Sequence, residues 1–382
     1  MSNDPVIVGV AESDLGVTGK SILQLIAQAS LKAVAEAGLT LDDVDGIATA
    51  GVARFSASAA AEYLGIAPTW MDSTFEGGSS FELQLNRAVE AIRTGSAEVV
   101  LIAYGSNQRS ASLRTLGGVT FPHTPEAQFE VPFGPLNPIS MYALAAQRHM
   151  HEFGTRPEDL AEIAVAARAW ALLNPAAYRY GAGPLTIDDV LGSPMISTPL
   201  HRLDCCLVTD GGGAVVVTGR DRARDLATSP ISVLGYGETT THVAMSQMPD
   251  LTSTGAVTSG ARAFAMAGLR PEDVDVVEVY DSFTITTLLT LEALGFADRG
   301  EGAALVADGG IAPGGRLPVN TSGGGLSYCH PGMFGIFLLI EAVRQLRGEG
   351  GARQVEGAEV ALVHGTGGIL TTHATVILGS DR

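Results

Sequence analysis

The 382-residue sequence predicts an α/β protein made of two related halves. Residues 30–51 return in modified form as residues 260–281, and residues 88–105 are paralleled by residues 340–368. Both sets place an amphipathic helix before a strand-like apolar run. Two repeated pairs in the same order argue for an internal duplication rather than for a chance similarity between alanine-rich helices.

The first repeated unit reads as a helix, an acidic turn and a strand. SLKAVAEAGLTLDDVDGIATAG and GARAFAMAGLRPEDVDVVEVYD share Ala-Gly-Leu where the helix should end and Asp-Val-Asp in the turn. Glycine commonly ends a helix because it adopts the left-handed conformation without steric cost. The β-branched residues after the turn then predict a strand.

The second repeated unit, a helix leading into an apolar strand with a glycine turn, completes the expected halves. AVEAIRTGSAEVVLIAYG is matched by IEAVRQLRG followed by AEVALVHGTGG. Apolar strands such as VVLIAYG and AVVVTG are typical of sheets that carry helices on both faces. We expect an N-terminal half over residues 1–225 and a C-terminal half over 226–382, joined within 221–230. A loop-rich and helical insertion at about 106–200 is of the kind that often covers an active site.

The composition excludes several classes of function. The formal net charge is −18 with no basic run, which argues against a nucleic-acid partner. The chain lacks an 18-residue apolar run and a basic leader segment, so we expect no membrane span and a cytoplasmic protein. Three cysteines, two of them adjacent, predict no disulfide framework, and no ligand spacing predicts a metal site. The only lysines, Lys20 and Lys32, lie in one N-terminal helix, which nearly excludes imine chemistry.

Four turns at strand ends or helix N-termini stand where ligands bind in α/β proteins. They are FEGGSSFE (75–82), VEVYDSFT (277–284), GGGLSYCHPGMFG (323–335) and LVHGTGG (362–368). Each follows or precedes an expected strand or helix, and strand ends and helix N-termini present backbone groups to a ligand. We therefore expect the site at these turns.

These turns carry a resemblance to the thiolase superfamily, in the branch of the sterol-carrier-protein thiolase domain and bacterial lipid-transfer proteins. VYDSFT, followed by LEALGF and GEGAALVADGG, resembles the family's Asn-Glu-Ala-Phe or His-Asp-Cys-Phe block. LPVNTSGGGLSYCHPGMFG resembles its Gly-His-Pro block, ALVHGTGG its C-terminal glycine loop, and PLHRLDCCLVTDGGGAVVVT the end of its first half. The resemblance spans essentially the whole chain and implies αβαβα layers in two duplicated halves, often dimeric.

The departures from the family pattern matter for the chemistry. Thiolases use a nucleophilic cysteine at a helix N-terminus of the first half, and Gly78 stands at that place here. Ser79 and Ser80 are the only hydroxyls nearby, and we interpret them first as residues that begin the helix. The family's second cysteine corresponds to His364. Claisen chemistry through an acyl-enzyme is therefore not expected.

Three residues in the matched blocks are the catalytic candidates. The resemblance implies that His330 holds the thioester oxygen as it gains charge, a role that needs only a neutral imidazole. Tyr280 and Tyr328 are phenols that could transfer protons, although either could simply pack. Cys329 is interpreted as a small buried residue. The residues expected to line the substrate pocket are Gly78, Ser80, Asn320, Gly324 and His364.

A site of this kind can bind an acyl-CoA and stabilise its enolate. That suits retro-aldol cleavage of a β-hydroxyacyl-CoA to a ketone or aldehyde and a shorter acyl-CoA, with Tyr328 as base and Tyr280 as acid, or the reverse. The similarity to aldolases of steroid side-chain degradation implies coenzyme A only as part of the substrate. It also implies a homodimer and a small partner subunit with an OB fold and a zinc ribbon. The alternatives are thiolase or acyltransferase activity through Ser80 or Cys329, an acyl-CoA or sterol carrier, and a structural subunit for that partner.

Overall fold

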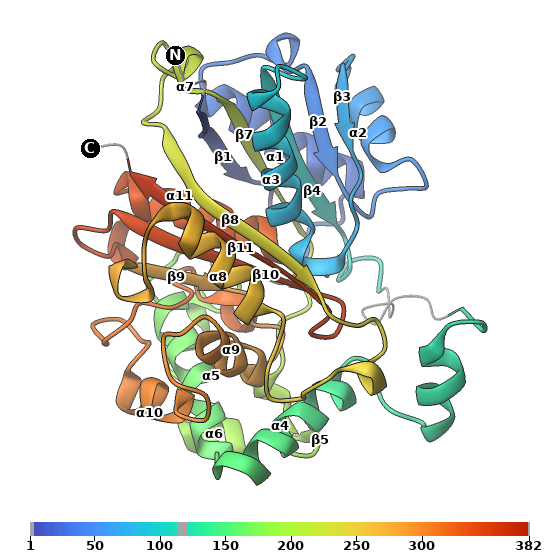
Figure 1. Cartoon of the computed structure of the whole chain (residues 1–382), viewed down its shortest axis with the longest axis vertical. Coiled ribbons are helices and arrows are strands. Elements are labelled where there is room, and N and C mark those ends of the chain that lie inside the picture. Colours follow the sequence, from blue (N-terminus) through green and yellow to red (C-terminus); the bar gives the residue numbers. More distant parts are fainter. Residues whose placement is uncertain (1–3, 113–120, 381–382) are drawn as a thin grey trace.

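The computed structural model of the chain describes residues 4–112 and 121–380 (Figure 1). The expected insertion at 106–200 thus includes residues 113–120, and the expected halves include residues 1–3 and 381–382, which lie outside the described residues. The expected division near residue 225 falls between a short helix ending at Ala223 and a strand beginning at Ile231.

Nine strands form one mixed sheet in the order β3-β2-β4-β7-β1-β8-β11-β10-β9. The strands are β1 (Pro5–Glu12), β2 (Gly46–Thr49), β3 (Trp70–Asp72), β4 (Val99–Ser106), β7 (Gly211–Gly219), β8 (Ile231–Thr240), β9 (Val276–Val279), β10 (Val360–Gly367) and β11 (Thr372–Ser380). The two halves meet where β1 pairs with β8 through Val6 and Ile7. In Figure 1 the blue and teal strands of the first half lie above the red strands of the second.

The strand pairings confirm the internal duplication. The first half runs β1-β7-β4-β2-β3, and the second runs β8-β11-β10-β9. β4 is antiparallel to β7 and parallel to β2, just as β10 is antiparallel to β11 and parallel to β9. Val319 forms a parallel bridge to Val277 on β9, where β3 stands in the first half. The repeated segments found in the sequence are therefore equivalent elements of two similar halves.

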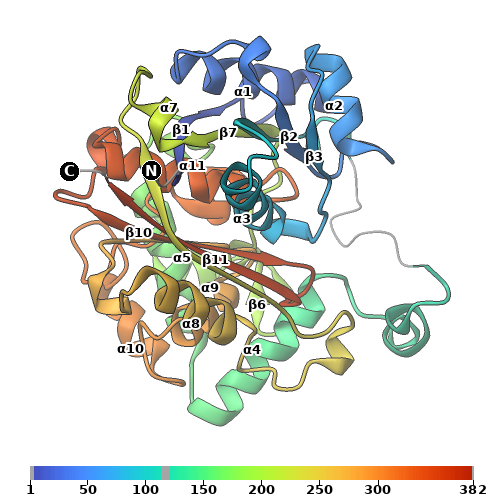
Figure 2. The ribbon, with the colours of Figure 1, turned by 45° about the horizontal axis from the view of Figure 1, so that its top comes forward.

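Helices form three layers around the two halves of the sheet. The longer ones are α1 (Ile22–Glu36), α2 (Ser56–Leu64), α3 (Ser80–Arg93), α4 (Ile139–Phe153), α5 (Pro157–Ala171), α8 (Ala256–Ala267), α9 (Thr284–Ala293) and α11 (Gly335–Arg347). The short ones are α6 (Ile187–Leu191), α7 (Arg220–Ala223) and α10 (Gly302–Val306). α1 packs on the first half and α8 on the second, whereas α3 and α11 pack on each other between the halves (Figure 2). α11 is accordingly buried on nearly all sides.

Glycines at matching strand positions let each outer helix approach its sheet. A Cβ at Gly9 on β1 would lie 2.1 Å from the carbonyl oxygen of Ala33 in α1. A Cβ at Gly235 on β8 would lie 2.3 Å from the carbonyl oxygen of Ala263 in α8. Both contacts are shorter than any side chain tolerates. The same close contact between a strand glycine and an outer helix in both halves supports the duplication, in addition to the sequence repeats and the strand pairings.

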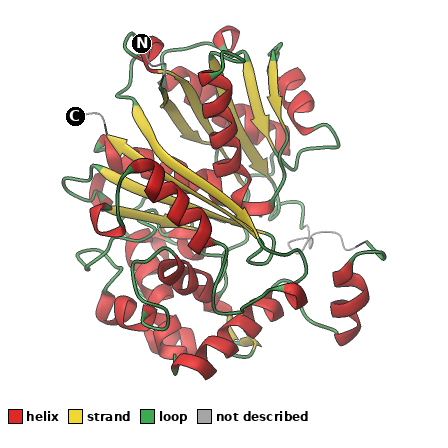
Figure 3. Cartoon of the chain, in the orientation of Figure 1, coloured by secondary structure: helices red, strands yellow, loops and turns green. Residues whose placement is uncertain are grey.

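The described part of the segment between β4 and β7 contains more helix than strand (Figure 3). It contains α4, α5, α6 and a small hairpin of β5 (Met195–Ser197) and β6 (Leu200–His201). α5 packs on α9 and on the turn at 324–328 of the second half, so the insertion contacts one of the turns singled out in the sequence. Among the described residues, no helix has both the length and the apolar character required to cross a bilayer.

The glycine contacts predict a matched set of stability changes. Gly9→Ala and Gly235→Ala should each lower the free energy of unfolding by about 1–3 kcal/mol, because the added methyl group must push a helix backbone away. Gly181→Ala is the control, since a Cβ there would meet nothing within 4 Å. Chemical denaturation of the three variants measures the difference. Equal stability of all three would contradict the close approach.

Candidate active site

The structure joins two predicted residues, Tyr280 and His330, in one hydrogen bond. The Tyr280 hydroxyl lies 2.9 Å from His330 Nε2, and the two rings meet edge to face. Tyr280 directly follows β9, and its N–H donates to the carbonyl oxygen of His364 on β10. His330 lies in the turn before α11, and its N–H donates to Thr209 Oγ1. Both side chains are buried, so a strand end and a turn from different parts of the second half fix the contact.

Burial keeps both members of this pair neutral. It raises the pKa of Tyr280 well above its ordinary value, and the nearby thiol of Cys206 adds to the effect. It also lowers the pKa of His330 to about 4. The resting site thus holds a protonated phenol against an uncharged imidazole. Such a pair can pass a proton along its hydrogen bond without first holding a charge.

The Tyr280 ring fills the space beside Gly78. A Cβ at Gly78 would lie 2.1 Å from Tyr280 Cε2 and 2.5 Å from the carbonyl oxygen of Thr366. A cysteine at residue 78 would therefore collide with the tyrosine before its sulfur was placed. The glycine and the tyrosine are two parts of one steric arrangement that excludes a nucleophile.

The two serines next to Gly78 belong to the turn. Ser80 Oγ donates to the carbonyl oxygen of Gly77 at 2.6 Å and accepts the Glu76 N–H at 2.9 Å. Ser79 Oγ donates to the carbonyl oxygen of Glu76 at 2.9 Å. Both side chains are fully buried, and Ser79 and Ser80 stand at the start of α3. Their hydroxyls hold the helix start, as expected for residues at that place.

Asp281 holds the glycine turn that precedes His330. Its carboxylate oxygens accept the N–H groups of Gly325 at 2.6 Å and Leu326 at 3.1 Å. A Cβ at Gly324 would lie 2.1 Å from Asp281 Oδ2, so the turn requires glycine there. Burial raises the pKa of Asp281 to about 7, although the two amides oppose this shift.

Asn320 joins this turn to the strand that carries Tyr280. Its Oδ1 accepts the Val279 N–H at 2.8 Å, and its own backbone is left-handed with φ 53°. Asn320 and Gly324 were expected to line the substrate pocket. The structure places both in the framework of the turn, with their contacts made to Val279 and Asp281.

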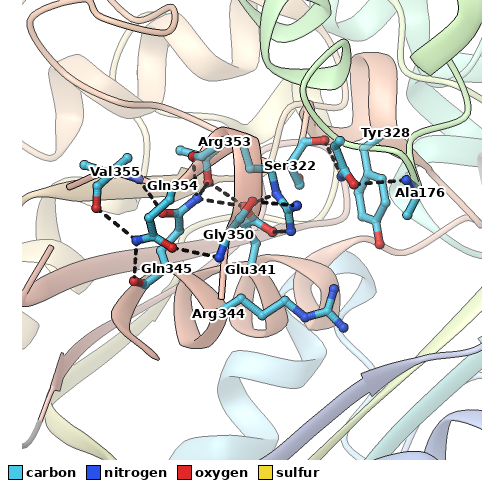
Figure 4. Close-up of polar contacts among 12 residues, drawn as sticks. Ala176, Ser322, Tyr328, Glu341, Arg344, Gln345, Gly350, Arg353, Gln354 and Val355 are labelled. Carbon is cyan, nitrogen blue, oxygen red and sulfur yellow. Dashed lines mark hydrogen bonds and ion pairs between the residues drawn. The ribbon is translucent and has the colours of Figure 1, made fainter. Parts of the chain in front are cut away.

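Tyr328 lies in the same turn but has a different partner. Its hydroxyl donates to Glu12 Oε1 at 2.8 Å, and Glu12 is ion-paired with Arg344 of α11. Figure 4 shows Tyr328 together with Arg344. Burial and the Glu12 carboxylate raise the pKa of Tyr328 well above its ordinary value, which disfavours its use as a base. The structure brings Tyr280 to His330, and Tyr328 to Glu12.

His364 and Cys329 are buried with other neighbours. His364 Nδ1 lies 2.8 Å from Thr375 Oγ1, and Nε2 lies 3.2 Å from His373 Nδ1, so the ring faces β11. Burial and His373 lower the pKa of His364 well below its ordinary range. Cys329 is inaccessible, and burial raises the pKa of its thiol, which matches the expectation of a small buried residue.

A pocket of about 340 Å³ adjoins these turns. Its walls are formed by Arg109, Arg168, Tyr178, Arg179, Arg202, Leu203, Cys205, Cys206, Leu207, Val208 and Leu326. The Cys206 N–H donates to the carbonyl oxygen of Ser282, and the Leu207 N–H donates to that of Gly325. One wall is thus attached to both the turn after Tyr280 and the turn before His330. The pocket lies beside the pair.

Four arginines give this pocket a positive charge in an acidic chain. Arg109, Arg168, Arg179 and Arg202 form no salt bridge within the part of the chain that the structure describes. Burial and the neighbouring Arg179 lower the pKa of Arg168, and Arg179 Nε is buried without a hydrogen-bond partner there. Uncompensated arginines at a pocket indicate an anion site. The sequence analysis did not identify this arginine cluster, because its residues are spread over positions 109 to 202 and share no regular spacing.

Comparison with known proteins identifies relatives along the whole chain. Residues 237–380 match the family model described as thiolase C-terminal domain-like. The chain is 38% identical to the 17-hydroxy-3-oxo-4-pregnene-20-carboxyl-CoA lyase of Mycobacterium tuberculosis, over 97% of this chain and 98% of that protein. It is 36% identical to the steroid side-chain-cleaving aldolase of Thermomonospora curvata, over 98% of each.

Solved structures agree with these relatives. The structure named Ltp2-ChsH2(DUF35) aldolase superposes with a TM-score of 0.91 at 34% identity, over 100% of this chain and 98% of that one. Human mitochondrial 3-ketoacyl-CoA thiolase superposes with a TM-score of 0.72 at 19% identity, over 100% and 99% of the two chains. The expected thiolase-like fold is therefore confirmed.

Glu82 is a buried acid beside the site that the sequence analysis did not single out. It lies in the first turn of α3, is fully buried, and has no hydrogen-bond partner for either carboxylate oxygen among the described residues. A Cβ at Gly335 would lie 2.5 Å, and one at Gly365 2.2 Å, from Glu82 Oε2, so both glycines make room for the carboxyl group. Burial raises the pKa of Glu82 to about 8.

This pKa predicts a pH-dependent stability difference for Glu82→Gln. The folded protein holds the Glu82 proton more tightly than the unfolded chain does. Stability is therefore lost as pH rises from about 4.5, the ordinary value, to about 8. Over that pH range the free energy of unfolding of Glu82→Gln, relative to that of the wild type, should rise by roughly 1.4 kcal/mol per pH unit. Urea denaturation at pH 5 to 8 measures it. A difference that does not change with pH would contradict a buried neutral acid.

Proposed function

We propose that this chain, which belongs to the thiolase superfamily in its sterol-carrier-protein-like branch, is a carbon–carbon lyase acting on acyl-CoA. Its reaction is the retro-aldol cleavage of a β-hydroxyacyl-CoA. The observation that carries this proposal is the Tyr280–His330 pair, which occupies the position next to Gly78 where a thiolase has its nucleophile. In place of a sulfur nucleophile, the proposed site has two hydrogen-bonded groups, Tyr280 and His330, that transfer protons.

The retro-aldol reaction suits a relay of this kind. A base removes the β-hydroxyl proton, the bond between the α- and β-carbons breaks, and the β-carbon becomes a ketone or aldehyde. The electron pair moves into a thioester enolate, and a proton returned to the α-carbon yields the shorter acyl-CoA. One proton leaves the substrate and one returns, so the protein needs neither a covalent intermediate nor a lasting change of charge.

The neutral pair can supply both transfers. Burial makes a lone phenolate or imidazolium costly, which favours giving and receiving the protons along the Tyr280–His330 hydrogen bond. We assign receipt of the β-hydroxyl proton to His330 Nδ1, which has no hydrogen-bond partner among the described residues, and donation to the α-carbon to Tyr280, which regains its proton from His330 Nε2. With Nδ1 protonated, the imidazole can donate a hydrogen bond to the thioester oxygen. The role of Tyr328 as the base stays a prediction from the sequence. To act as the base, its hydroxyl would have to break its hydrogen bond to Glu12.

The arginine pocket supports a coenzyme A thioester as substrate. Its four unpaired arginines provide the charge that the phosphates of coenzyme A require. Cys206, at the wall of the pocket, lies close enough to Tyr280 to raise the pKa of that phenol. A thioester whose phosphates bind the arginines can therefore extend toward the pair.

The acyl group and the assembly are proposed from the relatives. Two relatives are named for steroid side-chain substrates, so we propose a steroid side chain as the acyl group. The similar solved structure is named for two components, Ltp2 and ChsH2(DUF35), which supports a partner subunit for this chain. From the family resemblance we propose that this partner is small and has an OB fold and a zinc ribbon. We also propose a homodimer, for which β3 offers an edge strand of the sheet.

Acyl transfer through a covalent intermediate is poorly supported by this site. Ser80 is bound within its turn, and Cys329 is buried with a raised pKa. Burial likewise raises the pKa of Cys205 to about 12. No thiol near the pair is therefore readily ionised.

Tyr280→Phe tests the lyase assignment. The variant keeps the ring that fills the space beside Gly78 but loses the proton, so turnover should fall by about 10²–10⁴-fold while acyl-CoA binding is retained. Product release from a β-hydroxyacyl-CoA and calorimetric binding are the measurements. Tyr63→Phe, at an exposed tyrosine of α2, is the matched control. Unchanged turnover in Tyr280→Phe would end the proposal.

Arg179→Gln tests the anion pocket. Loss of one charge from the arginine cluster should weaken acyl-CoA binding by about tenfold at low salt, and less at high salt, with little effect on kcat. The control is Arg54→Gln, whose arginine lies over Phe55 away from the pocket. If both variants bind acyl-CoA as the wild type does, the phosphates bind elsewhere.

A further inference from the structure

Two buried carboxyl groups lie within hydrogen-bond distance of one threonine hydroxyl, next to the strand β9 that leads to Tyr280. Thr321 Oγ1 lies 2.8 Å from Glu278 Oε1 and 2.7 Å from Glu341 Oε1. All three side chains are buried. Glu278 belongs to β9 and Glu341 to α11, so the hydroxyl joins a strand, a turn and the central helix layer.

The hydroxyl cannot serve two ionised carboxylates. It has one proton to donate and two lone pairs to accept with. Gln345 Nε2 already donates to Thr321 Oγ1 at 3.0 Å, which uses one lone pair. Two carboxylates would need the same single proton at distances of 2.7 and 2.8 Å. One carboxyl group must therefore carry a proton and donate it to Thr321.

The ion pair of Glu341 shows which group carries the proton. Arg353 Nε and Nη2 each lie 2.8 Å from an oxygen of Glu341, a two-point contact that stabilises the carboxylate (Figure 4). Glu278 forms no salt bridge within residues 4–112 and 121–380, and its Oε2 has no hydrogen-bond partner there. Glu341 is thus the anion and Glu278 the acid.

The electrostatics of the cluster agree with this assignment. Burial, and then the Glu341 charge, raise the pKa of Glu278 well above its ordinary value. Burial alone would also raise the pKa of Glu341, but Arg353 lowers it. Beyond these groups lie Arg344, whose pKa Glu341 helps to raise, the Glu12 carboxylate that is ion-paired with Arg344, and the Tyr328 phenol that donates to Glu12.

We propose that Glu278 is held as a protonated acid and, through Thr321, acts as a positioning residue for the Tyr280–His330 pair. Glu278 lies on β9, and Tyr280 is the first residue after that strand. Val276 and Tyr280 belong to one hydrophobic core cluster and Val277 and Val279 to another, so the alternation of the strand places the Glu278 and Tyr280 side chains on the same face. The effect of Glu278 on turnover rests on the proposed lyase function, whereas the protonation of Glu278 does not.

The turn that contains Thr321 is hydrogen-bonded at three places to β9 and to the residues that directly follow it. Asn320 is bound to β9 by two hydrogen bonds, Thr321 to Glu278, and Gly325 to Asp281. The phenol comes from the strand and the imidazole from the end of the turn. The contact between Thr321 and Glu278 lies between the other two contacts. Its loss should therefore increase the distance between the Tyr280 phenol and the His330 imidazole.

Infrared spectroscopy tests the protonation without any assay of activity. The difference spectrum of wild type minus Glu278→Gln at pH 7 should show the carbonyl band of a protonated acid, and wild type minus Glu341→Gln a carboxylate band instead. A carboxylate band from Glu278→Gln would overturn the proposal. Failure of that variant to fold would also count against it, because glutamine matches a protonated glutamate in size and charge.

Two substitutions of Thr321 test the positioning. Thr321→Val removes the hydroxyl and should lower kcat by roughly tenfold to a hundredfold with little change in KM, because misplaced groups still bind substrate. Thr321→Ser keeps the hydroxyl and should restore kcat. If Thr321→Val has the wild-type kcat and only a lower Tm, the positioning role is wrong. An inactive wild type would instead refute the lyase proposal and leave the infrared result standing.

Discussion

The steric conflict between residue 78 and Tyr280 is the constraint on which the rest of this site depends. The ring of Tyr280, from the second half of the chain, lies where a side chain at residue 78 of the first half would begin. The same ring is fixed by its hydrogen bond to His330. Because α3 begins at this point, the central layer between the two halves brings the glycine and the tyrosine together.

Burial determines how such a site can react. Tyr280 and His330 are both buried, and each is neutral because its charged form would be poorly solvated. The same principle explains the buried acids Glu82 and Glu278, which hold protons that exposed carboxyl groups would lose. The pocket beside the pair is lined by four arginines without salt-bridge partners among the described residues. In the proposed mechanism, binding through charge and proton transfer through neutral groups therefore take place at different positions.

The amino-acid sequence predicted much of the fold because the repeats carry local information. Helix ends, acidic turns and apolar strands recur at matched places, and the pairings of β4 with β7 and of β10 with β11 confirm the equivalence. It also singled out the turns that carry Tyr280 and His330, which the structure joins by a hydrogen bond, and, from the family resemblance, the glycine at residue 78. It did not foresee the arginine pocket or Glu82, whose significance lies only in what surrounds them.

The sequence by itself determined which chemical groups are present and which turns hold them: a glycine in place of a nucleophile, with Tyr280, Tyr328 and His330 in matched blocks. Only the tertiary structure decided how they pair. Tyr280 meets His330, 50 residues away, whereas Tyr328 meets Glu12, 316 residues away. The reason is physical: a phenol's partner and pKa depend on the packing of distant segments around it, and that packing is not encoded in the spacing of nearby residues.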